Sequence, residues 1–197
     1  IATREFLREN ADWIRTTLIN EPRGFDAMVG ACLCEPSDPS CVTGVVFFNN
    51  VSYLESCIHG TIGVVETLAH LGRIAPGEHR IETPIGIIRA TLGADHLVTV
   101  KNVPSYRFAA QIKVSIPGFG TVTGDISWGG NWFFLISEQG PAVRRENIRE
   151  LTEFACAVRR ALEIQQITGT DGALIDHIEC FAPPADGINA DSQNFVL

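Results

Sequence analysis

Along the chain, segments with apolar residues at helical spacing alternate with short apolar segments typical of strands. Between residues 3 and 18 the apolar positions recur near helical spacing, which predicts an amphipathic helix over Thr3–Leu18. These positions are Phe6, Leu7, Ile14 and Leu18. Two strand-sized apolar runs follow, Ala27–Cys34 and Thr43–Asn49, with the turn-rich residues 35–40 between them.

The next element has almost no polar face. Gly60–Leu71 is apolar around most of its circumference and is followed by Gly72, which is a common helix end. A helix of this kind needs cover on several sides, and a sheet wrapped about it is the simplest cover. We therefore predict a buried helix here.

From residue 80 to residue 137 the pattern changes to short strands separated by turns, which predicts antiparallel meanders. The predicted strands are Arg80–Thr83, Gly86–Leu92, His96–Asn102, Gln111–Ile116, Thr121–Ser127 and Asn131–Ile136. A second amphipathic helix is expected over Asn147–Gln165, with Asn147 and Glu150 as a capping pair. Its expected buried stripe is Ile148, Leu151, Ala155, Val158 and Leu162. A strand over Ala173–Phe181 and a final strand at residues 194–197 complete an α+β fold.

Composition narrows the choice of function. The chain has 45% hydrophobic and 19% charged residues, which is typical of a folded globular protein. The net charge of -8 argues against nucleic acid and anionic membranes as partners. The longest apolar runs, Gly44–Phe48 and Trp132–Ile136, are strand-sized and too short to span a bilayer. The six cysteines are expected to be reduced thiols in a cytoplasmic protein, because a chain of this length does not need disulfides for its stability.

Both ends of the chain have features typical of a truncated sequence. Met28 is the only methionine, the chain starts at Ile1, and Leu197 lies inside an apolar, strand-like run. We therefore expect residues on both sides of the sequence.

The segment Tyr53–Gly63 carries the candidate chemistry. It places Cys57 and His59 at the entry to the predicted buried helix, where free backbone N–H groups and the helix dipole favour an anion. This position is expected to lower the pKa of the Cys57 thiol, and the N–H groups of Ile58, His59 and Gly60 could hold a ligand carboxylate. The alternative is that Cys57 is a small buried residue and His59 a hydrogen-bonded core histidine.

Several segments, in order along the whole chain, resemble one family of enzymes. They are Arg23-Gly24, Asp26-Ala27-Met28 and Gly30-Ala31, then Tyr53-Leu54 with Cys57-x-His59-Gly60, then Gly124–Phe134, Ile175–Glu179 and Asp191–Leu197. The family comprises the proline racemases, hydroxyproline 2-epimerases and trans-3-hydroxyproline dehydratases. The segment Trp128–Phe134 and His177 most resemble the 4-hydroxyproline 2-epimerase branch.

The resemblance implies a diaminopimelate epimerase-like fold with two lobes, each a sheet around a central helix, and the active site between them. Residues 1–125 would form the first lobe and residues 126–197 the start of the second, with the N-terminal strands of the first and the C-terminal part of the second missing. The implied activity is a cofactor-independent epimerisation of an imino acid, without a metal, in which one thiolate removes the α-proton and a second cysteine on the opposite face delivers one.

By the same resemblance, Cys57 is the first of these thiols. The amides of Ile58 and His59 would bind the substrate carboxylate, and His177 would line the pocket near the ring hydroxyl. Asp125 is a candidate pocket residue, but an aspartate before Gly129-Gly130 is better explained as ordering the turn.

The sequence also departs from the family pattern. Phe25 stands where a histidine is usual, Ser56 where a methionine is common, and Ile58 where a glycine is normal. Glu55 adds a negative charge beside the thiol and would raise its pKa if it pointed inward. Ile58 resists the backbone angles that glycine permits, so an impaired family member is a live alternative.

The family's second cysteine motif would follow Leu197, and none of the cysteines present fits that role. Whether that residue is cysteine or threonine separates an epimerase from a dehydratase.

Four other readings stay open. A proline racemase of the same family would use the same chemistry. A cysteine hydrolase or transferase would use Cys57 as nucleophile and His59 as base. A zinc module would use Cys32, Cys34, Cys57 and His59, although their spacing is unlike that of a zinc knuckle. A non-catalytic binding protein would retain only the pocket. A homodimer is compatible with the sequence, which does not report the oligomeric state.

Overall fold

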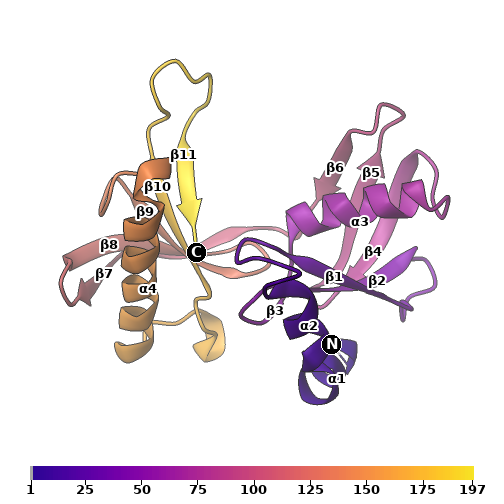
Figure 1. Ribbon diagram of the computed structural model, residues 1–197, viewed down its shortest axis with the longest axis horizontal. Coiled ribbons are helices and arrows are strands. Elements are labelled where there is room, and N and C mark those ends of the chain that lie inside the picture. The colour runs from indigo at the N-terminus through magenta and orange to yellow at the C-terminus, as the bar shows by residue number, and fades with distance from the viewer. Residues whose placement is uncertain (1) are drawn as a thin grey trace. The chain divides into compact units, whose positions relative to one another are not determined.

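A computed structural model describes residues 2–197 (Figure 1). The chain forms two compact units, a first that ends at Val103 and a second that runs from Pro104 to Leu197. The boundary predicted from the sequence, after residue 125, instead falls inside a strand of the second unit. Pro104 directly follows Val103, but a proline there is equally typical of a turn within a meander, so it does not mark a boundary between units by itself.

The first unit is built on a six-stranded mixed sheet with strand order β1-β2-β4-β5-β6 and with β3 paired to β2. The pair β2–β4 is parallel and the other pairs are antiparallel. The strands are β1 (Gly30–Cys34), β2 (Thr43–Phe48), β3 (Tyr53–Leu54), β4 (Gly77–Thr83), β5 (Gly86–Leu92) and β6 (Val98–Lys101).

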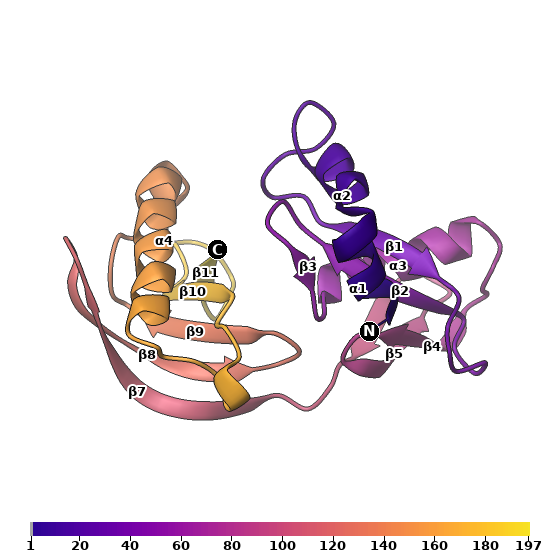
Figure 2. The same ribbon diagram turned by 90° about the horizontal axis from the view of Figure 1, so that it is seen from below.

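Strand β2 is buried on both faces, because a helical layer covers each of them. Val45 and Phe47 join a cluster with α3 (Ile58–His70). Val46 and Phe48 join a second cluster with α1 (Ala2–Asn10) and α2 (Asp12–Ile19), which lie on the other side of the sheet (Figure 2). The alternation of side chains along a strand therefore divides the core of this unit into two layers.

The helices of the first unit differ in detail from the sequence-based prediction. The single helix expected over Thr3–Leu18 is two helices, because Ala11 takes the non-helical angles φ -142° and ψ 25°. The resulting turn buries Arg15 and Ile19. Helix α3 is buried on one face only, through Thr61, Val64, Val65 and Leu68.

The second unit contains a five-stranded sheet in the order β11-β10-β9-β8-β7, with β9 and β10 parallel. Its strands are β7 (Tyr106–Ile116), β8 (Gly120–Trp128), β9 (Trp132–Ser137), β10 (His177–Ala182) and β11 (Gln193–Val196). Helix α4 (Ile148–Ile164) packs on one face of this sheet. A short 3₁₀ helix, η1 (Arg145–Asn147), comes directly before α4, and a second 3₁₀ helix, η2 (Thr170–Gly172), comes before β10. Together the two units confirm the predicted α+β class.

Two details predicted for α4 differ in the structure. Asn147 is the N-cap residue of α4, as predicted, but its side chain makes no capping hydrogen bond, because its amide donates to the Ala142 carbonyl at 3.0 Å. Ile148 lies outside the buried stripe and is 51% exposed, whereas the other four predicted positions are buried. Within residues 2–197, no helix combines the length and apolar character needed to cross a bilayer.

Asp125 stabilises an irregularity in the sheet of the second unit. Its carboxylate accepts a hydrogen bond from the Gln111 backbone N–H at 2.8 Å and pairs with Arg107 at 3.1 Å. Strand β7 changes register against β8 at this point, and Gln111 has a φ of 57°. These hydrogen bonds lower the pKa of Asp125, with the Gln111 N–H as the main cause. Asp125 therefore orders a bulge in β7, rather than the turn at residues 129–130.

We expect Asp125→Ala to lower the free energy of unfolding by about 1 kcal/mol, because it leaves a backbone donor without its partner. Asp125→Asn keeps an acceptor and should lose less. Because the folded-state pKa is depressed, this contribution is complete above the ordinary carboxyl pKa and is lost as the pH falls through the folded value. Urea unfolding at pH 7 and at pH 3 measures both effects, and an equal loss in the two variants at pH 7 would contradict this role.

Candidate functional site

A cavity of about 690 Å³ lies in the first unit, beside the start of α3. One side is formed by alternate residues of β1 and the segment before it, and the other by α3. The lining residues are Ala27, Val29, Ala31, Leu33, Cys57, His59, Gly60, Gly63, Val64 and Thr67. The alternation of the first four follows from the predicted strand Ala27–Cys34, although their role in a pocket was not predicted.

Cys57 is the N-cap residue of α3. It has extended backbone angles, φ -154° and ψ 110°, and its Sγ accepts a hydrogen bond from the Gly60 N–H at 3.3 Å. Its carbonyl accepts the Thr61 N–H at 2.9 Å and the Thr61 hydroxyl at 2.8 Å. A thiol at this position takes the place that a serine or aspartate oxygen usually occupies at a helix start.

Gly60 permits the close approach of the helix to the sheet. A Cβ at this position would lie 2.5 Å from the Phe47 ring and 3.3 Å from Cys57 Sγ. Phe47 is fully buried and cannot move aside without opening the core. The spacing of Cys57 and Gly60 is therefore set both by the helix cap and by the packing beneath it.

The predicted direction of the Cys57 pKa shift is wrong. Burial raises the pKa of the Cys57 thiol above its usual value, and the backbone N–H groups of Gly60 and His59 lower it by less. Burial penalises the thiolate because it removes water from the charged form, and the two N–H groups replace only part of that water. The N–H groups at the helix start therefore reduce, but do not cancel, the rise in pKa that burial causes, and the sequence pattern gave no measure of this burial.

Two departures from the family pattern have a structural explanation. Glu55 forms an ion pair with Arg4 of α1, so its charge is matched within the unit. Ile58 is the first residue of α3, where helical backbone angles suit isoleucine as well as glycine, and its side chain is 37% exposed. The expectation that Ile58 distorts the backbone at this position is therefore wrong. Arg4 was missed in the sequence, because nothing there indicates that residues 51 positions apart form an ion pair.

The structure brings three of the four predicted site residues together. Cys57, Ile58 and His59 are consecutive at the start of α3, and His59 is exposed and lines the cavity. His177 belongs to the second unit, at the start of β10, where its Nδ1 lies 2.9 Å from an oxygen of Asp176. Its ring packs on Phe133 with centroids 4.7 Å apart. These contacts fix the orientation of the imidazole.

The other cysteines have different surroundings. All six are free thiols. Cys180 is 1% exposed in the core under α4, where burial raises its pKa to about 11. In the described part of the chain, residues 2–197, no three potential ligands gather as a metal site would require. A role of Cys32 and Cys34 as ligands together with Cys57 gains no support.

Comparisons with solved structures define the fold. A probable proline racemase from Agrobacterium radiobacter, with bound carbonate, superposes with a TM-score of 0.86 at 18% identity, covering 98% of this chain and 61% of the other. A PhzF-family phenazine biosynthesis protein from Bacillus anthracis superposes with a TM-score of 0.52 at 15% identity, covering 93% and 61%. The fold is thus the α+β, diaminopimelate epimerase-like fold of these proteins.

Sequence comparison then identifies the family. The family described as "Proline racemase" matches residues 1–197. A 4-hydroxyproline 2-epimerase from Chromobacterium violaceum is 54% identical over 194 residues, and one from Pseudomonas aeruginosa is 55% identical over the same length. The matches cover 98% of this chain and 62% and 61% of those proteins, so the chain spans about three fifths of their length. The chain belongs to the proline racemase family.

The raised pKa of Cys57 has a measurable consequence. We expect the rate of Cys57 alkylation by iodoacetamide to rise with pH until the pH passes the ordinary thiol pKa of about 8.5, because only the thiolate reacts. Peptide mass spectrometry separates Cys57 from the other five cysteines. A rate that reaches its plateau below pH 8 would contradict the shift.

Proposed function

We propose that the protein is a cofactor-independent epimerase that inverts the α-carbon of 4-hydroxyproline, with Cys57 as one of its two proton-transferring groups. The observation that carries the proposal is a thiol that caps a helix and lines a cavity, in a chain 54–55% identical to 4-hydroxyproline 2-epimerases. The fold alone would leave the reaction open, since one fold hosts many activities.

The start of α3 supplies a place for the substrate carboxylate. The first N–H groups of a helix lack partners within it and face outward with the positive end of the dipole. The Ile58 N–H belongs to this first turn, and so does the His59 N–H, which also interacts with Cys57 Sγ. A carboxylate bound by Ile58 and His59 would bring the adjacent α-carbon close to the thiol.

The proton transfer then follows from the chemistry of the thiol. The thiolate of Cys57 takes the α-proton and becomes a thiol, and the electron pair of the broken C–H bond stays on the α-carbon next to the carboxylate. A second acid on the opposite face gives its proton to this carbon, which inverts the configuration. The enzyme ends with the two groups in exchanged protonation states, so the reverse reaction or exchange with water restores them.

The ligand's own charge offsets the cost of the buried thiolate. The ring nitrogen of an imino acid is cationic at neutral pH, and an opposite charge within about 4–6 Å favours the charged form of a nearby group. The raised pKa of the free thiol should therefore fall when the substrate binds. His177, whose imidazole contacts Asp176 and Phe133, is proposed to contact the ring hydroxyl of the substrate.

The cytoplasmic location and the homodimer stay predictions.

The test is exchange of the substrate α-proton in deuterium oxide, followed by NMR, with chiral chromatography of the product. We expect Cys57→Ser to lower the rate of exchange and inversion by at least about 100-fold, since general acid–base groups contribute factors of that size. Cys156→Ser, a change of the same kind on α4, should leave the rate unchanged.

Retention of the wild-type rate in Cys57→Ser would overturn the proposal. Loss of water from the substrate, giving an unsaturated ring instead of the epimer, would favour the dehydratase alternative. Exchange with proline and not with 4-hydroxyproline would favour a proline racemase.

A further inference from the structure

The segment that delivers Cys57 to the start of α3 is held from outside by two arginines. It runs from the turn after β2 through β3 to Ser56, and it lies next to α1 and α2. One arginine contacts each end of the segment. Neither is among the residues that line the cavity.

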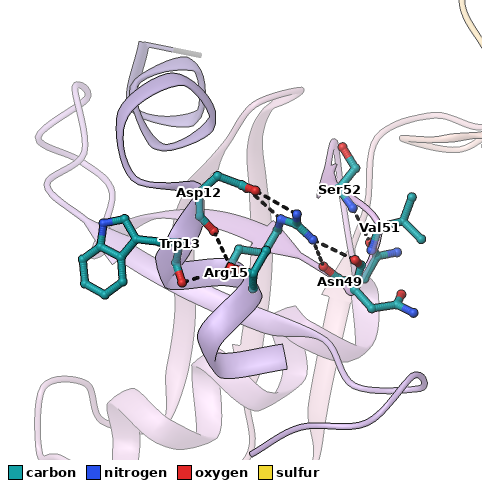
Figure 3. Close-up of polar contacts among 8 residues, drawn as sticks. Asp12, Trp13, Arg15, Asn49, Val51 and Ser52 are labelled. Atoms are coloured by element: carbon teal, nitrogen blue, oxygen red, sulfur yellow. Dashed lines mark hydrogen bonds and ion pairs between the residues drawn. The ribbon is translucent and has the colours of Figure 1, made fainter. Parts of the chain in front are cut away.

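Arg15 of α2 holds the first end. Its side chain is 10% exposed, and one of its terminal nitrogens donates to the carbonyls of Asn49 and Asn50 at 3.1 and 2.8 Å (Figure 3). The other nitrogens pair with both carboxylate oxygens of Asp12 at 2.8 and 2.9 Å, which fixes the plane of the guanidinium. The guanidinium also lies 6.0 Å from the centre of the Tyr53 ring. A bidentate pair of this kind orients an arginine as lysine could not.

The turn held by Arg15 is itself tightly closed. The Asn49 side-chain oxygen accepts the N–H groups of Val51 and Ser52 at 2.9 and 2.8 Å, and the Asn49 N–H donates to the Ser52 carbonyl at 2.9 Å (Figure 3). The chain then enters β3, where Tyr53 and Leu54 pair with β2. The position of this turn therefore determines where β3 begins.

Arg4 of α1 holds the second end. It forms an ion pair with Glu55, two residues before Cys57, and its side chain is only 13% exposed. It also lies 3.1 Å from Glu5, which steadies it on its own helix. Tyr53 and Ser56, on either side of this contact, are buried. The charged groups next to the thiol along the chain are therefore Glu55, matched by Arg4, and the titratable His59.

We infer that α1 and α2 form a positioning device for Cys57, in which Arg15 and Arg4 set where the sulfur stands at the start of α3. The role in catalysis rests on the proposed function, whereas the positioning of the thiol does not. Neither arginine is a catalytic residue, because each acts through the backbone between Asn49 and Ser56. A displacement of about 1 Å can lower a reaction rate by roughly 100-fold.

The test compares Arg15→Ala, Arg15→Lys and Arg4→Gln with the wild-type protein. The control is Arg8→Gln, which removes an arginine from the same helix as Arg4, where it pairs with Glu5 at 3.4 Å and is 48% exposed. For each protein we measure the kcat and KM of α-proton exchange, the pH profile of Cys57 alkylation by peptide mass spectrometry, and the melting temperature. Alkylation of Cys156 reports general unfolding.

Arg15→Ala is expected to lower kcat at least about tenfold with little change in KM, and to change the alkylation profile of Cys57 and not that of Cys156. Arg15→Lys should lie between this variant and the wild type. If Arg15→Ala does not fold, Arg15→Lys carries the same comparison. Arg8→Gln should match the wild type in all three measurements.

Arg4→Gln removes the positive charge that pairs with Glu55, so it should move the alkylation profile of Cys57 to higher pH. The double variant Arg4→Gln/Glu55→Gln should move it back, which a purely structural loss would not do.

The inference is overturned if Arg15→Ala and Arg15→Lys keep the wild-type kcat and Cys57 profile, or if Cys57 and Cys156 change together. If Cys57→Ser keeps full activity, the proposed function fails, and the alkylation profiles alone then decide whether the arginines position the thiol.

Discussion

The hydrogen bond from the Gly60 N–H to Cys57 Sγ is the contact on which the site depends. It places a sulfur where a helix start normally has an oxygen, and it does so over a sheet packed closely enough to exclude any side chain at position 60. The helix cap, the buried Phe47 ring and the absence of a Cβ at Gly60 depend on one another, because all three meet at position 60. A change in any of them moves the thiol relative to the N–H groups of α3.

The same packing creates an electrostatic conflict. The closeness that brings Cys57 onto the helix start also removes water from it, and the loss of water outweighs the two N–H groups that favour the thiolate. Under the proposed function, the cationic ring nitrogen of a bound imino acid would favour the thiolate and offset part of this cost. The ion pair with Glu55 places the positive charge of Arg4 beside the carboxylate that lies two residues before the thiol.

Most of the secondary structure follows from local patterns in the sequence. The bounds of β5 were predicted to the residue, and α3 and α4 to within two residues at each end, because strand alternation and helical spacing are properties of neighbouring positions. The break at Ala11 could not be predicted in this way, since alanine favours a helix and the packing of Ile19 with Val46 and Phe48 joins residues far apart in the chain. The boundary at Val103 could not be predicted either, because strands continue on both sides of it and only the contacts within each unit separate them.

The candidate site shows the same division. The sequence indicated that Cys57, Ile58 and His59 meet at a helix start, since all three are adjacent in the chain. It could not show how far Cys57 is buried, which reversed the expected pKa shift, nor that Arg4 and Arg15 reach this segment from another layer. Contacts between residues 34 to 51 positions apart depend on the fold as a whole.

The most direct test of the account is NMR of the protein with ¹⁵N-labelled isoleucine, histidine and glycine, titrated with 4-hydroxyproline. The account predicts that the amide signals of Ile58 and His59 shift more than those of other isoleucines and histidines, as the carboxylate binds at the start of α3. Unchanged Ile58 and His59 signals at a saturating concentration, as judged by shifts elsewhere, would contradict it.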